Sequence, residues 1–181
     1  MDHAVGYGAI VCESQTPAEN ALVLKHGRFF LLTNSHGDIA PAGHCSLGLF
    51  ENDTRILSHY QLRFAGGSPS LLSMQAPHGY IGCVDLTITD AEFGGNNWDP
   101  KNCVHISREL LVADRLIERL TLTNYLPNPV AYWLELHLAA DFADIFEIRG
   151  WKRGKRGQYF SPQTDRTVSY THLTLPTIYS V

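Results

Sequence analysis

Two short stretches of the sequence hold more charged residues than a surface loop requires. The longer one runs from Asp141 to Gly150 and places three carboxylates among phenylalanine and isoleucine residues. A pair of carboxylic acids can hydrolyse a glycosidic bond, because one protonates the leaving oxygen while the other activates water or attacks the sugar. The same segment could instead contact a ligand or a neighbouring domain. The candidate contact residues are Asp141, Asp144, Glu147 and Arg149.

A packing role for this segment needs no chemistry at all, and the composition favours it over catalysis. On a helical turn, Asp141 and Asp144 would share one face, and Phe142 and Phe146 would lie on another. The aromatic residues would then fill a core or an interface, together with Ile145. Arg149 and the basic residues after it would neutralise the carboxylates.

The second stretch, Gly48 to Ser58, holds an acid and a base two residues apart. Asp53 and Arg55 are flanked by apolar positions, which predicts an ion pair that is at least half buried and fixes a turn between two strands. The alternative is that these two side chains contact a sugar hydroxyl or a neighbouring domain.

Several other classes of site find no support in the residue pattern. With 14 Lys and Arg against 18 Asp and Glu, the net charge of −4 argues against a nucleic-acid binder. The four cysteines match no zinc spacing, and none of the nine histidines are paired at metal-ligand spacing, so we predict neither a metal nor a cofactor. No apolar run reaches the roughly 18 residues of a membrane span, and the first residues carry no secretory signal, which predicts a cytoplasmic protein.

The elements that must position these residues are mostly strands. Apolar and polar residues alternate with a period of two between clusters of turn-forming residues. The segment Val104–Asn124 fits either a helical stripe or two strands with a turn at Ala113-Asp114. Many strands separated by turns predict an all-β antiparallel sandwich or barrel. The predicted strands are 21–24, 29–33, 57–64, 80–89 and 130–139.

Together the two charged stretches resemble motifs of one protein family. Gly48-Leu49-Phe50, with Asp53-Thr54-Arg55 and Leu57-Ser58 following, is similar to a "GLF…DTR.LS" motif, and residues 141–150 resemble "DFAD.FE.RG". Both motifs are those of the N-terminal domain of prokaryotic glycogen-debranching enzymes of the amylo-alpha-1,6-glucosidase type. The family's opening strand pair is similar to 24–38, and the resemblance covers about 22–157. The residues that fall on its "R…E…L…N" pattern are Arg108, Glu118, Leu120 and Asn124.

This resemblance implies an antiparallel β-sandwich domain, here over residues 4–167, with strands in Val104–Asn124. In the family, the sandwich precedes an (α/α) toroidal domain that holds the catalytic acid and base. We therefore expect no catalytic residue in this chain. It would be an accessory domain of an α-1,6-glucosidase of glycogen or related α-glucans, packing on the catalytic domain in cis and lining its substrate cleft.

The last fourteen residues, 168–181, are expected to be foreign to the protein. The run Val168–Thr177 reads as the translation of a sequencing-library adaptor rather than as an evolved strand. We therefore expect a truncated reading frame in which the sandwich is a fragment of a longer enzyme.

Two other functions fit the same composition. A stand-alone carbohydrate-binding module would need aromatic rings facing solvent, and Trp98, Trp133 and Trp151 are the candidates. A purely structural sandwich of an unrelated assembly would show no apolar patch awaiting a partner. An accessory domain separated from its catalytic domain would show such a patch, larger than the few hundred Å² usual on monomers.

Overall fold

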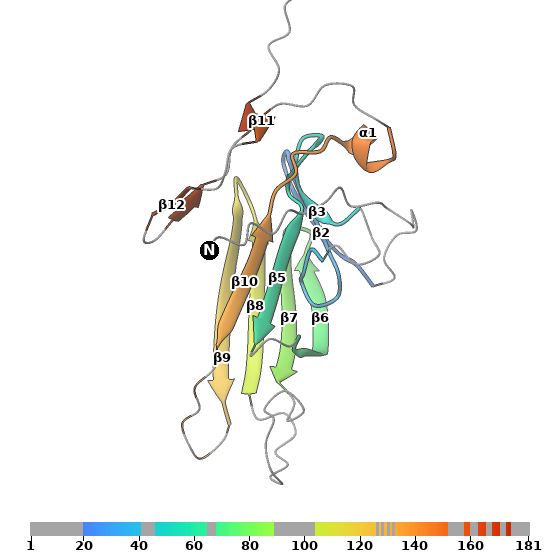
Figure 1. Ribbon diagram of the computed structural model, residues 1–181. Coiled ribbons are helices and arrows are strands. Elements are labelled where there is room, and N and C mark those ends of the chain that lie inside the picture. Colours follow the sequence, from blue (N-terminus) through green and yellow to red (C-terminus); the bar gives the residue numbers. More distant parts are fainter. Residues whose placement is uncertain are drawn as a thin grey trace, which may run out of the picture.

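The computed structural model describes residues 20–40, 46–64, 68–88, 104–125, 127, 129, 131 and 133–151, and the backbone of four short strands beyond them (Figure 1). Strands make up nearly all of its regular structure, as the sequence pattern predicts. The strands before α1 are β1 (Leu22–His26), β2 (Phe29–Thr33), β3 (Gly48–Glu51), β4 (Thr54–Leu57), β5 (His59–Phe64), β6 (Ser70–His78), β7 (Ile81–Ile88), β8 (Val104–Val112), β9 (Leu116–Asn124) and β10 (Leu134–Ala139). After them come α1 (Ile145–Ile148), β11 (Gln158–Tyr159), β12 (Gln163–Asp165), β13 (Val168–Tyr170) and β14 (Leu173–Thr174).

The strands form antiparallel sheets that face one another as a sandwich. One sheet has the order β6-β7-β8-β9, a second has the order β1-β2-β3-β4, and β10 pairs with β5. β1 packs against β6, β7 and β8, while β2 packs against β8, which joins the layers. Of the two short pairs beyond α1, β11 pairs with β14, and β12 pairs with β13. The boundary at residue 167 and the foreign origin of 168–181 stay predictions.

The segment that fitted either a helix or two strands forms the hairpin β8–β9. Its strands pair along their whole length, from Val104 opposite Asn124 to Val112 opposite Leu116. The turn lies at 113–115, where Ala113 N donates to Arg115 O at 2.9 Å. The helical interpretation is wrong because β8 buries every second side chain against the opposite layer, which only an extended chain can do.

Other boundaries differ from the pattern in two ways. The predicted strand 57–64 is interrupted at Ser58, where β4 ends and β5 begins in another sheet. β6 was not predicted, and β3 and the start of β4 were implied only by the turn expected between two strands near Asp53 and Arg55. Among the described residues, no helix has the length and hydropathy to cross a membrane.

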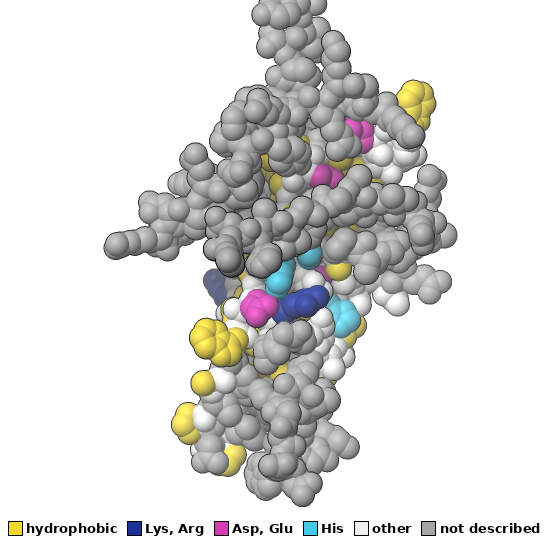
Figure 2. Space-filling view, in the orientation of Figure 1, with side chains coloured by type: hydrophobic (Ala, Val, Ile, Leu, Met, Phe, Trp, Pro, Cys, Tyr) yellow, Lys and Arg dark blue, Asp and Glu magenta, His cyan; other side chains and the backbone are white. Residues whose placement is uncertain are grey.

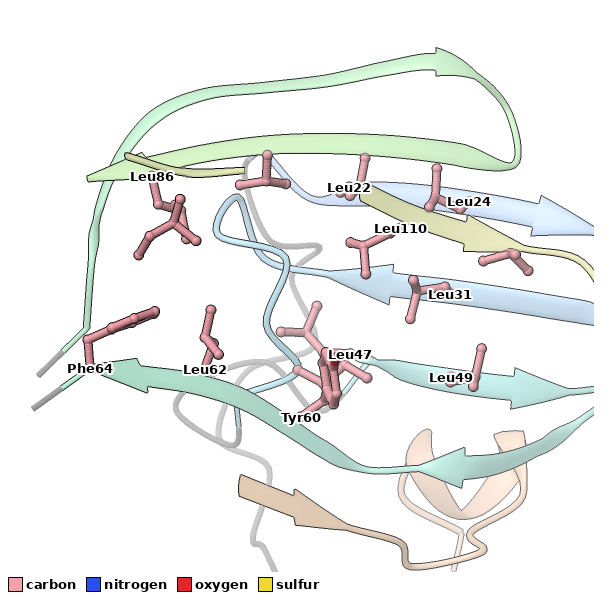
Figure 3. Close-up of a cluster of buried hydrophobic side chains, with 14 of the residues drawn as sticks. Leu22, Leu24, Leu31, Leu47, Leu49, Tyr60, Leu62, Phe64, Leu86 and Leu110 are labelled. Carbon is pink, nitrogen blue, oxygen red and sulfur yellow. The ribbon is translucent and has the colours of Figure 1, made fainter. Parts of the chain in front are cut away.

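The core lies between the layers and consists mainly of leucine, isoleucine and valine side chains. Figure 3 shows the leucines of β1, β2, β3 and β5 pointing toward those of β7 and β8. Full burial of one such side chain contributes about 1.5–3 kcal/mol to stability. The buried apolar residues are Leu22, Leu24, Phe29, Leu31, Ile39, Leu47, Leu49, Tyr60, Leu62, Phe64, Val84, Leu86, Ile88, Val104, Ile106, Leu110 and Val112.

Candidate functional site

The two charged stretches of the sequence lie side by side in the fold. Arg55 N donates a hydrogen bond to Ala143 O at 2.8 Å, and Ile145 N donates one to Asp53 O at 2.9 Å. Thr54 and Asp144 form an antiparallel bridge between these two bonds. The β3–β4 hairpin therefore holds the segment 141–151, which we call the docking turn, along the outer edge of β4.

A buried arginine fastens this docking turn. Arg55 donates through Nε to Asp141 Oδ1 at 3.1 Å and through Nη2 to Asp141 Oδ2, so the guanidinium and carboxylate meet as a fork. Its Nη1 also donates to Leu47 O at 3.2 Å. A Cβ on Gly48 would lie 2.5 Å from Arg55 Cδ, so the stem of the arginine occupies the space that a side chain would need. The glycine of the "GLF" stretch thus makes room for the ion pair between Arg55 and Asp141, which we call the clamp.

The ion pair predicted between Asp53 and Arg55 is wrong in its partner. Arg55 is 8% exposed and pairs with Asp141, 86 positions further along the chain. Asp53 lies exposed in the β3–β4 turn and contributes its backbone carbonyl. Asp53 directly precedes β4 in the exposed turn, whereas Arg55 is the one buried residue of β4.

The carboxylates of the docking turn are used to build it. Asp144 is the N-cap of α1 and accepts hydrogen bonds from the backbone N–H groups of Phe146 and Glu147, each at 2.8 Å. Glu147 Oε2 accepts from Asp144 N at 3.1 Å, which completes a capping box. Capping of this kind stabilises a helix by about 1 kcal/mol.

The shared helical face predicted for Asp141 and Asp144 is wrong. Phe142 has a φ of +50°, in the left-handed region, so the chain reverses direction before α1 begins at Ile145. Asp141 therefore turns inward to Arg55, while Asp144 stays at the helix start. The two groups have separate structural tasks and are not arranged as an acid and a base flanking one bond.

The docking turn exposes aromatic rings rather than burying them. Phe146 is 57% exposed and Trp151 is 74% exposed, and their rings meet edge to face with centroids 6.2 Å apart. The predicted filling of the core by Phe146 is therefore wrong for this chain, although Phe142 and Ile145 are half-buried. Arg149, the C-cap residue of α1, is exposed. Trp133 is also exposed, at 82%, and Trp98 lies outside the described residues.

A second charged cluster, which sequence reasoning did not single out as a site, lies inside the sandwich. Arg108 has no exposed surface; it donates through Nε to Glu118 Oε1 and through Nη1 to Asp38 Oδ1, each at 2.6 Å. Its guanidinium also donates to His36 O at 2.7 Å and to Gly37 O at 3.2 Å, and it lies 5.7 Å from the Tyr60 ring centroid.

The cluster ties three parts of the chain together. Asp38 Oδ1 also accepts from Leu62 N at 3.2 Å, so the loop after β2 is joined to β5 and β8 through one carboxylate. Gly37 has a φ of +79°, and a Cβ there would lie 3.3 Å from Arg108 Cζ. The signal available in the sequence was an arginine at the inward position of an alternating strand, because every second residue of β8 is buried.

The comparisons with known proteins match this arrangement of motifs to one family. A family model described as the N-terminal domain of some glycogen debranching enzymes matches residues 24–176, most of the chain. The chain belongs to this family. No curated protein matches it. The resemblance noted from the two charged stretches is thereby confirmed.

For this debranching-enzyme N-terminal domain, the structure explains the quoted motifs as structural contacts. The arginine of "DTR" and the first aspartate of "DFAD" form the clamp, and the second aspartate and the glutamate form the capping box. The arginine and glutamate of "R…E" form the buried cluster. Among the described residues, no group of three or more His, Cys, Asp or Glu side chains could hold a metal ion.

Glu118 is the unusual member of the buried cluster. Burial, reinforced by the nearby charge of Asp38, raises the pKa of Glu118 to about 8. Its Oε2 atom is buried and accepts no hydrogen bond from the residues that the structure describes. One negative charge, on Asp38, suffices to neutralise Arg108, so the cluster gains little from a second one. The raised pKa favours the uncharged carboxyl form of Glu118.

We expect Glu118 to make this domain less stable as the pH rises from about 5 to 9. In the unfolded chain Glu118 ionises near its ordinary pKa of 4.5, whereas in the folded domain it keeps its proton up to about pH 8. Its contribution to the free energy of unfolding is therefore complete below pH 4.5 and decreases as the pH rises through 8. Glu118→Gln keeps the acceptor for Arg108 without this titration. Its melting temperature should match that of the wild type near pH 5 and exceed it by a few degrees at pH 9. Glu109→Gln, at an exposed position of β8, is the control; equal pH profiles for all three proteins would contradict the assignment.

Proposed function

We propose that this chain is the N-terminal accessory domain of a cytoplasmic α-1,6-glucosidase acting on glycogen or related α-glucans. In this proposal it packs on the catalytic domain through the docking turn and has no hydrolytic activity alone. The observation that carries the proposal is the pair of exposed rings, Phe146 and Trp151, on a turn that the fold fixes in place.

The support comes from the contrast between the two sides of the docking turn. Its inner side is fixed by the fork between Arg55 and Asp141 and by the backbone bonds to β4. Its outer side shows aromatic surface to solvent, which is unfavourable unless a partner covers it. A rigid turn loses little conformational entropy when a partner binds, so its rings are suited to anchor an interface.

Two of the six predicted site residues keep exposed side chains and remain candidates for contact with the glucan or the catalytic domain. They are Asp53 and Arg149. The other four hold the docking turn in place: Arg55, Asp141, Asp144 and Glu147. We propose that they influence substrate only indirectly, through the position of the docking turn. The acid and base for hydrolysis would come from the catalytic domain.

The test uses the catalytic domain of a full-length family member, produced separately and titrated with this chain. We expect the double variant Phe146→Ala, Trp151→Ala to bind it at least about tenfold more weakly, because truncating buried aromatic anchors costs about 2 kcal/mol or more. Trp133→Ala, at a tryptophan of similar exposure outside the turn, is the matched control. Unchanged affinity in the double variant, or release of glucose from a branched limit dextrin by this chain alone, would overturn the proposal.

A stand-alone carbohydrate-binding module is the second candidate, favoured by the solvent-facing rings of Trp133 and Trp151. Electrophoresis through gels containing glycogen separates it from the first. This candidate would be selected if glycogen retards the wild-type chain, Trp151→Ala abolishes the retardation, and the wild-type chain has no affinity for the catalytic domain.

A further inference from the structure

β10 is an outer strand of the sandwich, seen in front of β9 and beside β5 in Figure 1. It pairs antiparallel with β5 from Leu134 opposite Phe64 to Ala139 opposite His59. Among the described strands, none pairs with its other edge. An unpaired edge is a template for pairing with another strand, and proteins usually protect it with charge, proline or a covering loop.

The backbone groups on this open edge can be identified from β5. Tyr60 exchanges hydrogen bonds with Ile39, and Leu62 N donates to Asp38, so both direct their backbone groups away from β10. Residues directly opposite in an antiparallel pair point their backbone groups alike, either toward or away from each other. Leu138 and Leu136, which lie opposite Tyr60 and Leu62, therefore present their N–H and C=O groups at the open edge.

The side chains at this edge are apolar and only half covered. Leu134, Leu136 and Leu138 share the face of β10 that continues the buried face of β5, yet they are 47%, 45% and 52% exposed. A strand added beside β10 would cover them with side chains of its own. Main-chain bonds would then supply affinity, and side-chain fit would supply specificity.

The sequence of β10 is complementary to itself in the antiparallel direction. A two-fold axis through Leu136 sets Leu134 opposite the partner's Leu138, and Glu135 opposite the partner's His137. Within one strand, His137 Nε2 and Glu135 Oε2 already lie 3.1 Å apart, so the two groups are compatible neighbours. Glu135 also lies opposite Arg63 of β5, and Figure 2 shows charged and histidine side chains together over β5 and β10.

We propose that β10 is a dimerisation strand that pairs with β10 of a second copy of this chain, forming the continuous sheet β5–β10–β10–β5. Such an isologous interface needs one surface that fits its own copy, and the alternation of leucine with an acid and a histidine provides it. Leucines of both copies cover each other on the inner face. On the outer face, Glu135 of each copy meets the partner's His137.

Sedimentation velocity over a range of chain concentrations tests this dimer. The wild type should sediment as monomer and dimer in a concentration-dependent ratio. His137→Glu places the new carboxylate opposite Glu135 of the other copy, on both sides of the two-fold axis. This repulsion should weaken the dimer at least about tenfold. The exchange Glu135→His, His137→Glu restores opposite partners and should restore the dimer. Thr121→Glu adds the same charge on the outer face of β9 and should leave it unchanged, with folding of every variant checked by circular dichroism.

Three outcomes would overturn the proposal. A wild type that stays monomeric at all concentrations, with fast amide exchange at Leu136 and Leu138, shows an edge without an occupant. A monomer in which these amides are protected shows that another segment of the same chain covers the edge of β10. A dimer that persists in His137→Glu and fails to respond to the exchange variant uses a different surface.

Discussion

Arg108→Met is expected to lower the free energy of unfolding by about 3–5 kcal/mol, the cost of breaking a buried ion pair by removing one partner. Asp38 and Glu118 face Arg108 with almost no exposed side-chain surface, so the Asp38 carboxylate cannot recover its hydration and the Glu118 carboxyl group loses its donor when the guanidinium is gone. The carbonyls of His36 and Gly37 also lose their donors. Urea denaturation followed by circular dichroism measures the loss through the midpoint and slope.

The control and the rescue for this variant separate buried charge from side-chain volume. Arg119→Met changes an exposed arginine on the neighbouring strand and should alter stability by less than about 0.5 kcal/mol. Adding Asp38→Asn and Glu118→Gln to Arg108→Met leaves no ionisable group in the cluster and should recover much of the stability. A loss below 1 kcal/mol in Arg108→Met, or no recovery in the triple variant, would contradict the assigned role.

Arg55→Met is expected to lower the free energy of unfolding by about 2 kcal/mol, which is typical of hydrogen bonds to a charged group. The expected loss is smaller than at Arg108 because the Asp141 side chain is 31% exposed and can be hydrated in the variant. The docking turn should loosen while the sandwich stays folded. Hydrogen exchange measures this directly, since the amide of Ile145, bonded to Asp53 O, should exchange faster.

Arg28→Met is the matched control for Arg55→Met. Arg28 also forms an ion pair, with Glu51 at 2.8 Å, but its side chain is 62% exposed. Exposed pairs contribute about 0–1 kcal/mol, so stability should change little and the Ile145 amide should stay protected. Equal exchange of that amide in the wild type and Arg55→Met would show that the clamp does not hold the docking turn.

The parts of the fold that local sequence determines were predictable. Alternation and turn residues predicted an antiparallel sandwich or barrel and five of the ten strands before α1, because period-two burial is a local property of a strand in contact with a core. The hairpin β8–β9 was not decided by its own pattern, since leucine and arginine suit helices as well. Packing against the opposite layer selects the strands.

The contacts at the candidate site depend on distant residues, which explains where prediction failed. Asp53 is near Arg55 in sequence, yet Asp141 is its partner in space, because the buried face of β4 points toward the docking turn. Arg108 occupied an inward position of β8 that alternation predicts to be apolar. An ionisable residue at such a position is a signal for a buried ion pair. Its charged partner, Asp38, lies 70 positions earlier in the chain, and Glu118 lies on the neighbouring strand β9.

The separation of 86 residues between Arg55 and Asp141 has a consequence for how the chain folds. The clamp cannot contribute until the loop between its partners has closed, and the strands β5 to β10 lie within that loop. Contacts between residues distant in the sequence also slow folding, because the chain loses conformational entropy on closing the loop before the contact energy is gained. We therefore expect the clamp to close after the rate-limiting barrier, so that Arg55→Met accelerates unfolding and leaves the refolding rate in stopped-flow measurements unchanged.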